Sequence, residues 1–509
     1  MMRDIPRSVW YIVGAAFLVR LVFFLAVLLT SGDSAFMTGD SRGFLQIARN
    51  VAEGRGISQS DSAPFLPDSR FPPIFALTLG GSLYVFGSFL PILILNMILG
   101  SIVPLFAYRM GAYFTPLQPE VPPLQGGEEY GVRKVHGKPQ PLGRVVTGFT
   151  ENRKTGIIAA ILAAFEPLTL ILSLLLIPHP LSLIFLLSAV LLFIIFLESR
   201  SAWHACASGA FLGLSVLVRP HGKLLFLFAF LFFIGAAFRE LRAGFIIRRI
   251  VVPAAAFFLA SIIVLSPWAI RNYYHFGTFD ISSTGLRNIY TDFAVSVVSY
   301  KTGEAYGDVE AMLEEDFARR HGIAVKDIDR DPQWGNLLFK EGIGIIARNP
   351  KEAIFVFSIT MTAFFTQDLY MYFSQVFGVL EPGTIDFSPS MVLAKEGPAK
   401  LFALVWDRLG FGALIPLAGR ILWVGFFALS SIGFFIAISR RGRERTLALL
   451  FGFLIVYHAA TSLAAGFSAH GFHRYPANVF FFILLSYALV AFISLRTGIR
   501  ARASAESAP

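Results

Sequence analysis

The chain of 509 residues is 55% hydrophobic and only 15% charged, and its mean hydropathy is +0.65. This composition excludes an ordinary soluble globular protein and indicates a polytopic membrane protein whose main partner is the lipid bilayer. The formal net charge of +10 does not call for a nucleic acid, because the basic residues cluster in loops that would face anionic lipid headgroups.

Apolar runs long enough to span about 30 Å of hydrocarbon, roughly 20 residues each, recur along the chain. We predict an all-α protein with about ten crossings, within a range of ten to twelve, at 9–30, 89–112, 156–175, 180–198, 204–219, 221–238, 250–269, 412–438, 446–466 and 475–495. If both termini are cytoplasmic, every basic cluster lies on the cytoplasmic side, as the positive-inside rule requires. The segments 31–88, about 271–350 and 470–474 are then extracytoplasmic.

Three stretches do not fit the pattern of simple crossings. Residues 72–86 and 355–380 are apolar but short or interrupted by polar residues, and we expect them to lie at the interface or to re-enter the membrane. Residues 113–155 are rich in Pro, Gly and basic residues and are expected to form a disordered cytoplasmic insertion.

The predicted organisation therefore has five parts. They are a first pair of crossings around the loop 31–88 (residues 1–112), the insertion 113–155, the third to seventh crossings (156–270), an extracytoplasmic region (271–350) and a C-terminal membrane region (351–509).

Asp40 is the candidate catalytic residue, because it places a carboxylate just beyond the first crossing. It lies at the start of an amphipathic helical pattern that ends at Gly54. A carboxylate at the membrane surface can act as general base toward an acceptor hydroxyl. The competing interpretation is that Asp40 is only the N-cap of this helix.

Two groups of basic residues are candidates to bind a lipid phosphate. Arg70 precedes Phe71-Pro72-Pro73, where a guanidinium can grip a phosphate at the interface. Arg474 and Tyr475, with His473, belong to the sequence AHGFHRYP before the last crossing. The competing interpretation is ordinary anchoring of these side chains among the headgroups.

Further ionisable residues lie in or near the apolar runs, where isolated charges are costly and usually face a cavity or a partner. Glu166, His179, His473 and Arg271 can line an aqueous cavity shared with Asp40, although a helix-end residue reaching water explains Glu166 equally well. Arg20 has no evident partner, and Arg219 is interpreted as a surface anchor. His470 and His473 do not carry a full metal motif, so no metal ligands are assigned.

The order of the motifs GDSRGFLQIARNVAEGRG, RFPPIFALTLGGSLYVFG, NMILGSIVPLFAYRMGAYF, PWAIRN and HRYP resembles that of GT-C fold glycosyltransferases. The resemblance covers most of the chain and is to the protein-mannosyltransferase-like and aminoarabinose-transferase-like members, which use lipid-linked sugars. It implies a GT-C architecture with interfacial helices in the first extracytoplasmic loop, Asp40 as catalytic acid residue, and Arg70, Arg474 and Tyr475 at the donor phosphate. His179 stands where members commonly have an acidic residue, and this departs from the family pattern.

The resemblance implies a hexosyl- or pentosyltransferase of the bacterial inner membrane, with an extracytoplasmic active site. Its donor would be a polyprenyl-phosphate sugar, its acceptor a glycolipid, glycan or protein, and its outcome inversion by direct displacement. No cofactor is assigned, while a divalent metal assisting at the phosphate stays open. The alternatives are a flippase for a lipid-linked glycan and a non-catalytic envelope assembly protein.

Overall fold

The structure, a computed structural model, describes residues 5–114, 153–240, 247–325, 328, 333–366, 389–468 and 471–506. The insertion predicted at 113–155 lies almost entirely outside the described residues, and so do His470 and residues 367–380 of the apolar stretch 355–380. Within the described ranges all regular structure is helical.

Eight helical stretches among the described residues are long and apolar enough to cross a membrane. Each matches a crossing predicted from the sequence, which confirms an all-α polytopic membrane protein. The helices concerned are α1 (Arg7–Ser31), α4 (Leu90–Ala112), α7 (His179–Ser199), α9 (Leu225–Glu240) together with the helical turn that precedes it from Pro220, α10 (Val252–Phe276), α18 (Leu414–Ser439), α19 (Arg443–Ser462) and α21 (Asn478–Glu506).

The two other predicted crossings form helices too short to pass the same test. Helix α8 (Ala202–Val218) is apolar but has only 17 residues. The stretch 156–175 is divided into α5 (Arg153–Phe165) and α6 (Pro167–Leu172). The division follows from the sequence, because Pro167 has no N–H to continue α5 and Glu166 caps α6 instead.

The ambiguous stretch at 72–86 forms α3 (Pro73–Phe86), which at 14 residues is shorter than a crossing requires. Proline at its first position and Gly87 in the left-handed conformation at its end define its limits. Helix α15 (Pro350–Thr366) covers the beginning of the other ambiguous stretch.

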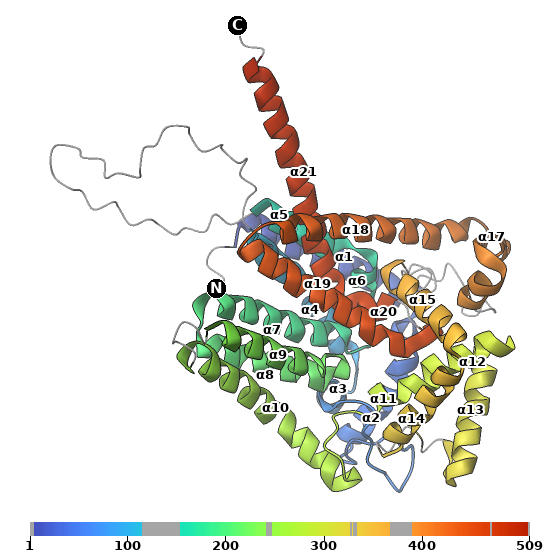
Figure 1. Cartoon of the computed structure of the whole chain (residues 1–509). Coiled ribbons are helices and arrows are strands. Elements are labelled where there is room, and N and C mark those ends of the chain that lie inside the picture. Colours follow the sequence, from blue (N-terminus) through green and yellow to red (C-terminus); the bar gives the residue numbers. More distant parts are fainter. Residues whose placement is uncertain are drawn as a thin grey trace.

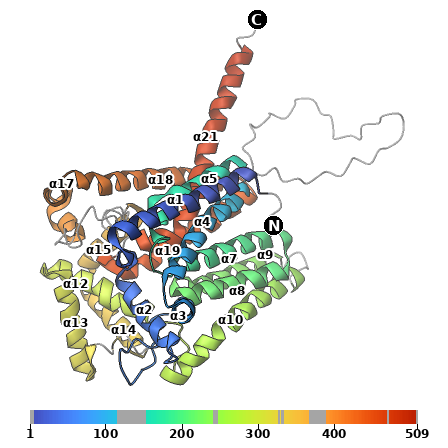
Figure 2. The ribbon, with the colours of Figure 1, turned by 180° about the vertical axis from the view of Figure 1, so that it is seen from behind.

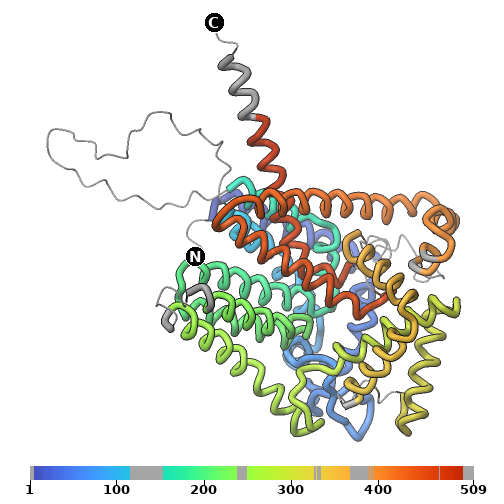
Figure 3. Tube along the Cα trace, in the orientation of Figure 1, coloured from blue at the N-terminus to red at the C-terminus, as the bar shows by residue number. Residues whose placement is uncertain are grey.

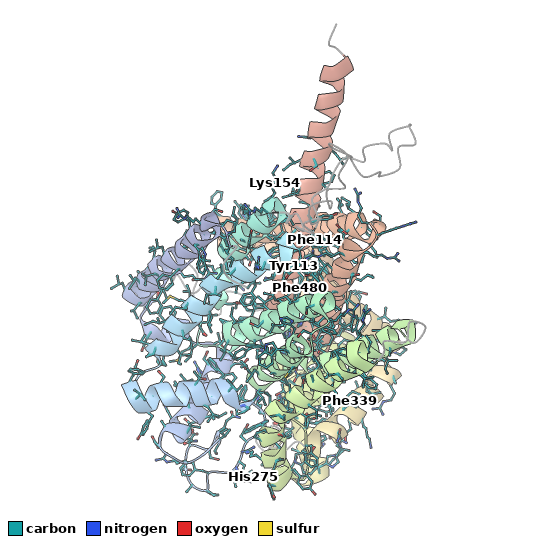
Figure 4. All side chains as sticks on the ribbon, turned by 90° about the vertical axis from the view of Figure 1, so that its left-hand side faces the viewer. Tyr113, Phe114, Lys154, His275, Phe339 and Phe480 are labelled. Carbon is teal, nitrogen blue, oxygen red and sulfur yellow. The ribbon has the colours of Figure 1, made fainter. Side chains whose placement is uncertain are left out.

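The membrane helices form two groups. Helices α7, α8, α9 and α10 lie side by side, and α1, α4, α5, α18, α19 and α21 form the second group (Figure 1). Helix α1 begins close to α5 and α21 and ends next to α2 (Gly39–Ala52), on the opposite side of the molecule (Figure 2). The same polarity is visible in Figure 4, where Lys154 at the start of α5 and His275 at the end of α10 occupy opposite ends.

The three segments predicted to be extracytoplasmic meet at one end of the molecule, which we call the loop end (Figure 3). The hydroxyls of Ser282 and Thr284 both donate to the carbonyl oxygen of Arg70, at 2.7 and 2.9 Å. The backbone N–H of Phe467 donates to the hydroxyl of Ser296 at 2.9 Å. Segments from the first loop, the region 271–350 and the turn before 470 are thus directly connected.

The region 271–350 adds a small helical lobe at the loop end. Its members are α11 (Thr284–Asn288), the π-helix η5 (Ile289–Ala294), α12 (Val295–Thr302), α13 (Tyr306–His321) and α14 (Gln333–Arg348). The lobe has its own apolar cluster around Tyr290, Phe317 and Leu338. It packs against the 3₁₀ segment η8 (Leu463–Ser468), which follows α19.

Close helix contacts depend on glycine at defined positions. A β-carbon on Gly433 of α18 would overlap the carbonyl oxygen of Leu484 in α21, and one on Gly209 of α8 would overlap that of Phe257 in α10. Such small residues let helix backbones approach each other, which supplies much of the packing energy between helices in a membrane.

We expect Gly433→Ala to lower the free energy of unfolding by about 1–3 kcal/mol, because α18 and α21 must separate to admit the methyl group. Thermal unfolding in detergent measures the effect. Gly425→Ala, in the same helix with no atom within 4 Å of the added carbon, is the matched control and should be neutral or stabilising. Equal melting temperatures for both variants would contradict the prediction.

Candidate functional site

The start of α2 carries Asp40 as an exposed side chain. The N-cap of this helix is Thr38, which forms a capping box with Ser41, so the interpretation of Asp40 as the N-cap is wrong. Ser41 is buried, and its hydroxyl donates to the carbonyl oxygen of Leu176 at 2.8 Å. Asp40 is therefore held beside the segment that leads into α7 and His179.

Arg219, at the end of α8, is half-buried. Its positive charge interacts with the negative charge of Asp40. One guanidinium nitrogen lies 3.4 Å from Nε2 of His221. The sequence-based interpretation of Arg219 as a surface anchor missed this position inside the loop end.

Behind Arg219 lies a small polar pocket of about 20 Å³, the polar pocket below. Its wall is built from the start of α7, the end of α8, the short turn η2 (Pro220–Gly222), α19 and the 3₁₀ turn η9 (Tyr475–Ala477). The lining residues are His179, Ser182, Leu183, Leu186, Ser215, Arg219, His221, Gly222, His458, Tyr475 and Pro476. His473 of α20 (Gly471–Arg474) lies next to it, with its ring centroid 6.1 Å from that of His221.

A larger cavity of about 450 Å³, the apolar groove below, lies between the two groups of membrane helices. It is lined mainly by Leu, Phe, Val and Ala side chains of α7, α8, α9, α10 and α19. Leu186 belongs to the walls of both the groove and the polar pocket, so the two spaces adjoin. Phe228, Phe232 and Leu449 of its lining are exposed, which opens the groove toward the surrounding lipid.

Arg70 lies beside α2, as the contacts of its neighbour show. The ring of Phe71 is centred 4.2 Å from that of Phe44, and it covers Gly43, one turn from Asp40. The backbone of Arg70 is fixed by Ser282, Thr284 and Asp68, whereas its side chain is only half-buried and lies over Phe71. Arg70 is thus on the same side of the molecule as Asp40 and does not line the polar pocket.

Arg271 has a different environment from the one predicted. It donates to the carbonyl oxygens of Asp68 and Ile57, at 2.8 and 3.4 Å, and lies over the ring of Trp268. The structure therefore uses Arg271 to hold the first loop against α10, and the side chain is not among those that line the polar pocket.

Arg474 and Glu166 belong to a buried polar network rather than to a surface. Arg474 is completely buried, lies 3.5 Å from the ring centroid of Trp423, and donates to the carbonyl oxygen of Phe364. Glu166 accepts from Nε1 of Trp423 at 3.2 Å and from the backbone and hydroxyl of Thr169.

Arg20 also belongs to this network and has the partners that its sequence context did not reveal. It donates to the hydroxyl of Ser173 at 2.8 Å and to the carbonyl oxygens of Ala16 and Ala164. Of the predicted phosphate ligands, Tyr475 reaches the polar pocket, while the pocket lining does not include Arg474.

Asp292 fastens the helical lobe to η8. Its carboxylate accepts from the hydroxyl of Tyr306 at 3.2 Å, and that hydroxyl also lies 3.2 Å from the hydroxyl of Ser468. The backbone carbonyl of Asp292 accepts from Ser296, which in turn holds Phe467. This network places the lobe directly before the segment that carries His473 and Tyr475.

The position of Asp292 predicts a dependence of stability on pH. Burial raises the pKa of Asp292 to about 6 from 3.8, and Arg287 and three hydroxyls oppose the shift. The folded protein thus binds this proton more tightly, and the free energy of unfolding falls as pH rises from about 4 to about 6, by at most about 3 kcal/mol. Asp292→Asn should unfold at a higher temperature than the wild type at pH 7.5 and at the same temperature at pH 4.

Thermal unfolding in detergent across this pH range tests the prediction, with Asp308→Asn at an exposed position of α13 as control. A wild-type stability that does not change between pH 4 and 7.5 would count against Asp292 as the responsible group.

The histidines around the polar pocket do not form a metal site in the described part of the chain, because no three His, Cys, Asp or Glu side chains there are arranged to hold an ion. We therefore derive no step through a metal.

Two residues of the site were missed from the sequence, His221 and His458. The sequence VRPHG at the end of α8 contains an Arg and a His at a helix end, as HRYP does. This similarity between the two motifs could have indicated His221 as a site residue. His458 lies inside the apolar helix α19. An ionisable residue within an apolar run usually faces a cavity or a partner, so His458 could have been proposed as a site residue from the sequence.

Comparisons with known proteins give a structural likeness and no sequence match. No protein-family model and no curated protein matches the chain. Among solved structures, the chain is similar to the archaeal oligosaccharyltransferase AglB from Archaeoglobus fulgidus in complex with an inhibitory peptide and a dolichol-phosphate, with 15% identity, a TM-score of 0.47, and coverage of 98% of this chain and 52% of that chain. The apo form of the Archaeoglobus fulgidus oligosaccharyltransferase gives 14% identity, a TM-score of 0.45 and the same coverage. The chain spans about half the length of these structures.

Proposed function

We propose that this chain is a GT-C type membrane glycosyltransferase that moves a sugar from a polyprenyl-phosphate donor to an acceptor hydroxyl on the extracytoplasmic side. The observation that carries the proposal is the apolar groove that adjoins the polar pocket, with Arg219 in the wall of the pocket and the charge of Asp40 acting on Arg219. A donor with a prenyl tail and an anionic head matches this arrangement, because its tail fits the apolar groove and its head meets Arg219 at the polar pocket.

The size and opening of the groove support a lipid donor. A volume of about 450 Å³ falls in the range of roughly 300–1,000 Å³ that is usual for ligand sites. Exposed aromatic and aliphatic side chains at its edge give a prenyl chain access from the bilayer. Where nucleotide sugars are absent, a transferase must take its sugar from a carrier in the membrane.

In the proposed reaction, the acceptor oxygen attacks the anomeric carbon and its proton passes to the carboxylate of Asp40. The bond between the anomeric carbon and the phosphate oxygen breaks, and polyprenyl phosphate leaves with the electron pair. Arg219 stabilises the charge on the departing phosphate, and Arg70, on the same side of the molecule as Asp40, can meet donor or acceptor. A single displacement of this kind inverts the configuration of the sugar.

The surroundings of the site support the proposed location and partners. The first loop-end segment supplies Asp40 and the last supplies His473 beside the polar pocket, so an acceptor in the extracytoplasmic space would reach Asp40 without crossing the membrane. We assign the protein to the bacterial inner membrane on the basis of the positive-inside pattern and the family resemblance. The acceptor class, a glycolipid, glycan or protein, is open to direct identification.

The test is transfer of a radiolabelled sugar from polyprenyl phosphate in proteoliposomes, with extracted envelope glycolipids, glycans and proteins as acceptors. Ala229→Phe fills the groove and should raise the KM for the donor at least tenfold, whereas Leu231→Phe, on the exposed face of the same helix, should not. Labelled carrier that changes leaflet with its sugar still attached, without transfer to any acceptor, would overturn the proposal and favour a flippase.

A further inference from the structure

The polar pocket contains imidazole nitrogens that have no partner in the part of the chain that the structure describes. Neither ring nitrogen of His458 has a hydrogen-bond partner, and Nδ1 of His221 and the hydroxyl of Tyr475 have none either. The side chains of His458 and Tyr475 are each only 1% exposed. Because buried polar groups are almost always satisfied, a cluster of this kind points to a ligand or water that occupies the pocket.

The charges around the pocket favour an anion. Arg219 contributes a fixed positive charge, and the pocket lining includes no carboxylate. The titratable and charged groups around His458 and His221 are Arg219 from α8, His179 from α7, Tyr457 from α19, His473 from α20, Tyr475 from η9 and, through its interaction with Arg219, Asp40 from α2.

The volume of the pocket defines which part of an anion it accepts. About 20 Å³ holds one water-sized atom. A single non-bridging oxygen of a phosphate fits this space, while the phosphorus and the remaining oxygens would stay near Arg219. The adjoining apolar groove is then in the correct place for an attached prenyl chain.

We propose that the polar pocket binds one oxygen of a phosphate monoester and that His458, with His221, takes up a proton from solvent as the phosphate binds. A neutral imidazole has one donor and one acceptor nitrogen, whereas the protonated ring has two donors and suits an oxyanion. An anion within hydrogen-bond distance favours the charged form of the ring. The inference rests on the proposed function and assigns the leaving phosphate to residues other than Arg70 and Arg474.

The consequence for the reaction is a second site of charge neutralisation. As the sugar–phosphate bond breaks, the phosphate gains negative charge, and a protonated His458 would meet that charge with a hydrogen bond. No other reactant is needed, since the proton comes from water and returns to it when the carrier phosphate leaves.

The experiment is calorimetric titration of the purified protein with farnesyl phosphate at pH 7.5, in two buffers with different ionisation enthalpies. The difference between the two heats gives the number of protons taken up. We expect an uptake of about half a proton to one proton per bound phosphate. His458→Gln should abolish this uptake and weaken the binding of farnesyl phosphate at least tenfold. His221→Gln should reduce both the proton uptake and the affinity. This second variant keeps the test decisive if His458→Gln does not fold.

The control variant is His204→Gln, at the opposite end of α8 from Arg219, where the ring lies 2.9 Å from the hydroxyl of Ser199. It should take up protons as the wild type does. Farnesol, which lacks the phosphate, should bind without uptake, and inorganic phosphate should compete with farnesyl phosphate with the same uptake if the phosphate group alone is recognised.

Binding of farnesyl phosphate without proton uptake, or with an uptake that His458→Gln leaves unchanged, would overturn the inference and leave sugar transfer intact. Competition by farnesol but not by inorganic phosphate, again without proton uptake, would show that water fills the pocket and would also overturn it. The transfer assay on the same preparations distinguishes these results from failure of the proposed function, which would appear as a loss of transfer from every donor.

Discussion

Asp40→Asn is expected to lower kcat for sugar transfer by about 10²–10⁴-fold while the protein remains folded. A positioned general base contributes an acceleration of this size, and the amide cannot accept the proton of the acceptor. The helix start does not depend on this residue, because Thr38 and Ser41 form the capping box. The measurement is the single-turnover rate with preloaded donor in proteoliposomes.

The control for this prediction is a second carboxylate of the same loop. Asp33→Asn replaces another exposed carboxylate of the same loop and should leave kcat within a factor of two or so of the wild type, as is usual for surface positions. Donor binding should survive in Asp40→Asn, since the groove is unchanged. Transfer at the wild-type rate by Asp40→Asn would remove the general base from the mechanism.

Glu166→Gln is expected to lower the free energy of unfolding by about 3–5 kcal/mol. Glu166 is buried and its charge interacts with those of Arg474 and Arg20, so the amide removes a favourable interaction from two buried guanidinium groups. The amide must also replace a carboxylate that accepts from Trp423 and Thr169. Thermal unfolding in detergent, followed by tryptophan fluorescence, measures the change.

The matched comparison is Glu198→Gln, which breaks a partly exposed ion pair with Arg443 of 2.6 Å at the other end of α7. Exposed pairs of this kind contribute about 0–1 kcal/mol, so its melting temperature should change little. If the two glutamine variants melted together, the buried network would not carry the stability assigned to it.

The crossings could be predicted from the sequence because apolar length decides them. The runs around α1, α4, α7 and α21 stand out by hydropathy alone, and the structure places helices there. The break between α5 and α6 could not be predicted as easily, since Glu166 was considered as a cavity residue and not as the cap of a new helix. The length of the apolar run favours one continuous helix, whereas capping by Glu166 favours a new helix start. In this stretch the cap determines where the helices end and begin.

The site was predicted less completely than the fold, because it is assembled from helix ends far apart in the sequence. Asp40 and Arg219 are 179 positions apart in the printed numbering, and nothing local to either residue indicates that they interact. Arg474 and Tyr475 are adjacent in the sequence, yet only Tyr475 lines the polar pocket. Consecutive helical residues point in different directions, so a short motif does not determine which of its members reaches a ligand.

The extent of the apolar groove has a consequence for carrier selection. Its lining on α19 runs from Thr446 to Leu454, which corresponds to roughly 12 Å of helix at 1.5 Å per residue. Only the first few isoprene units of a long carrier can therefore touch the protein, and the remainder stays dissolved among the acyl chains. Affinity should rise with the number of isoprene units and then reach a plateau, so that carriers of very different total length become interchangeable.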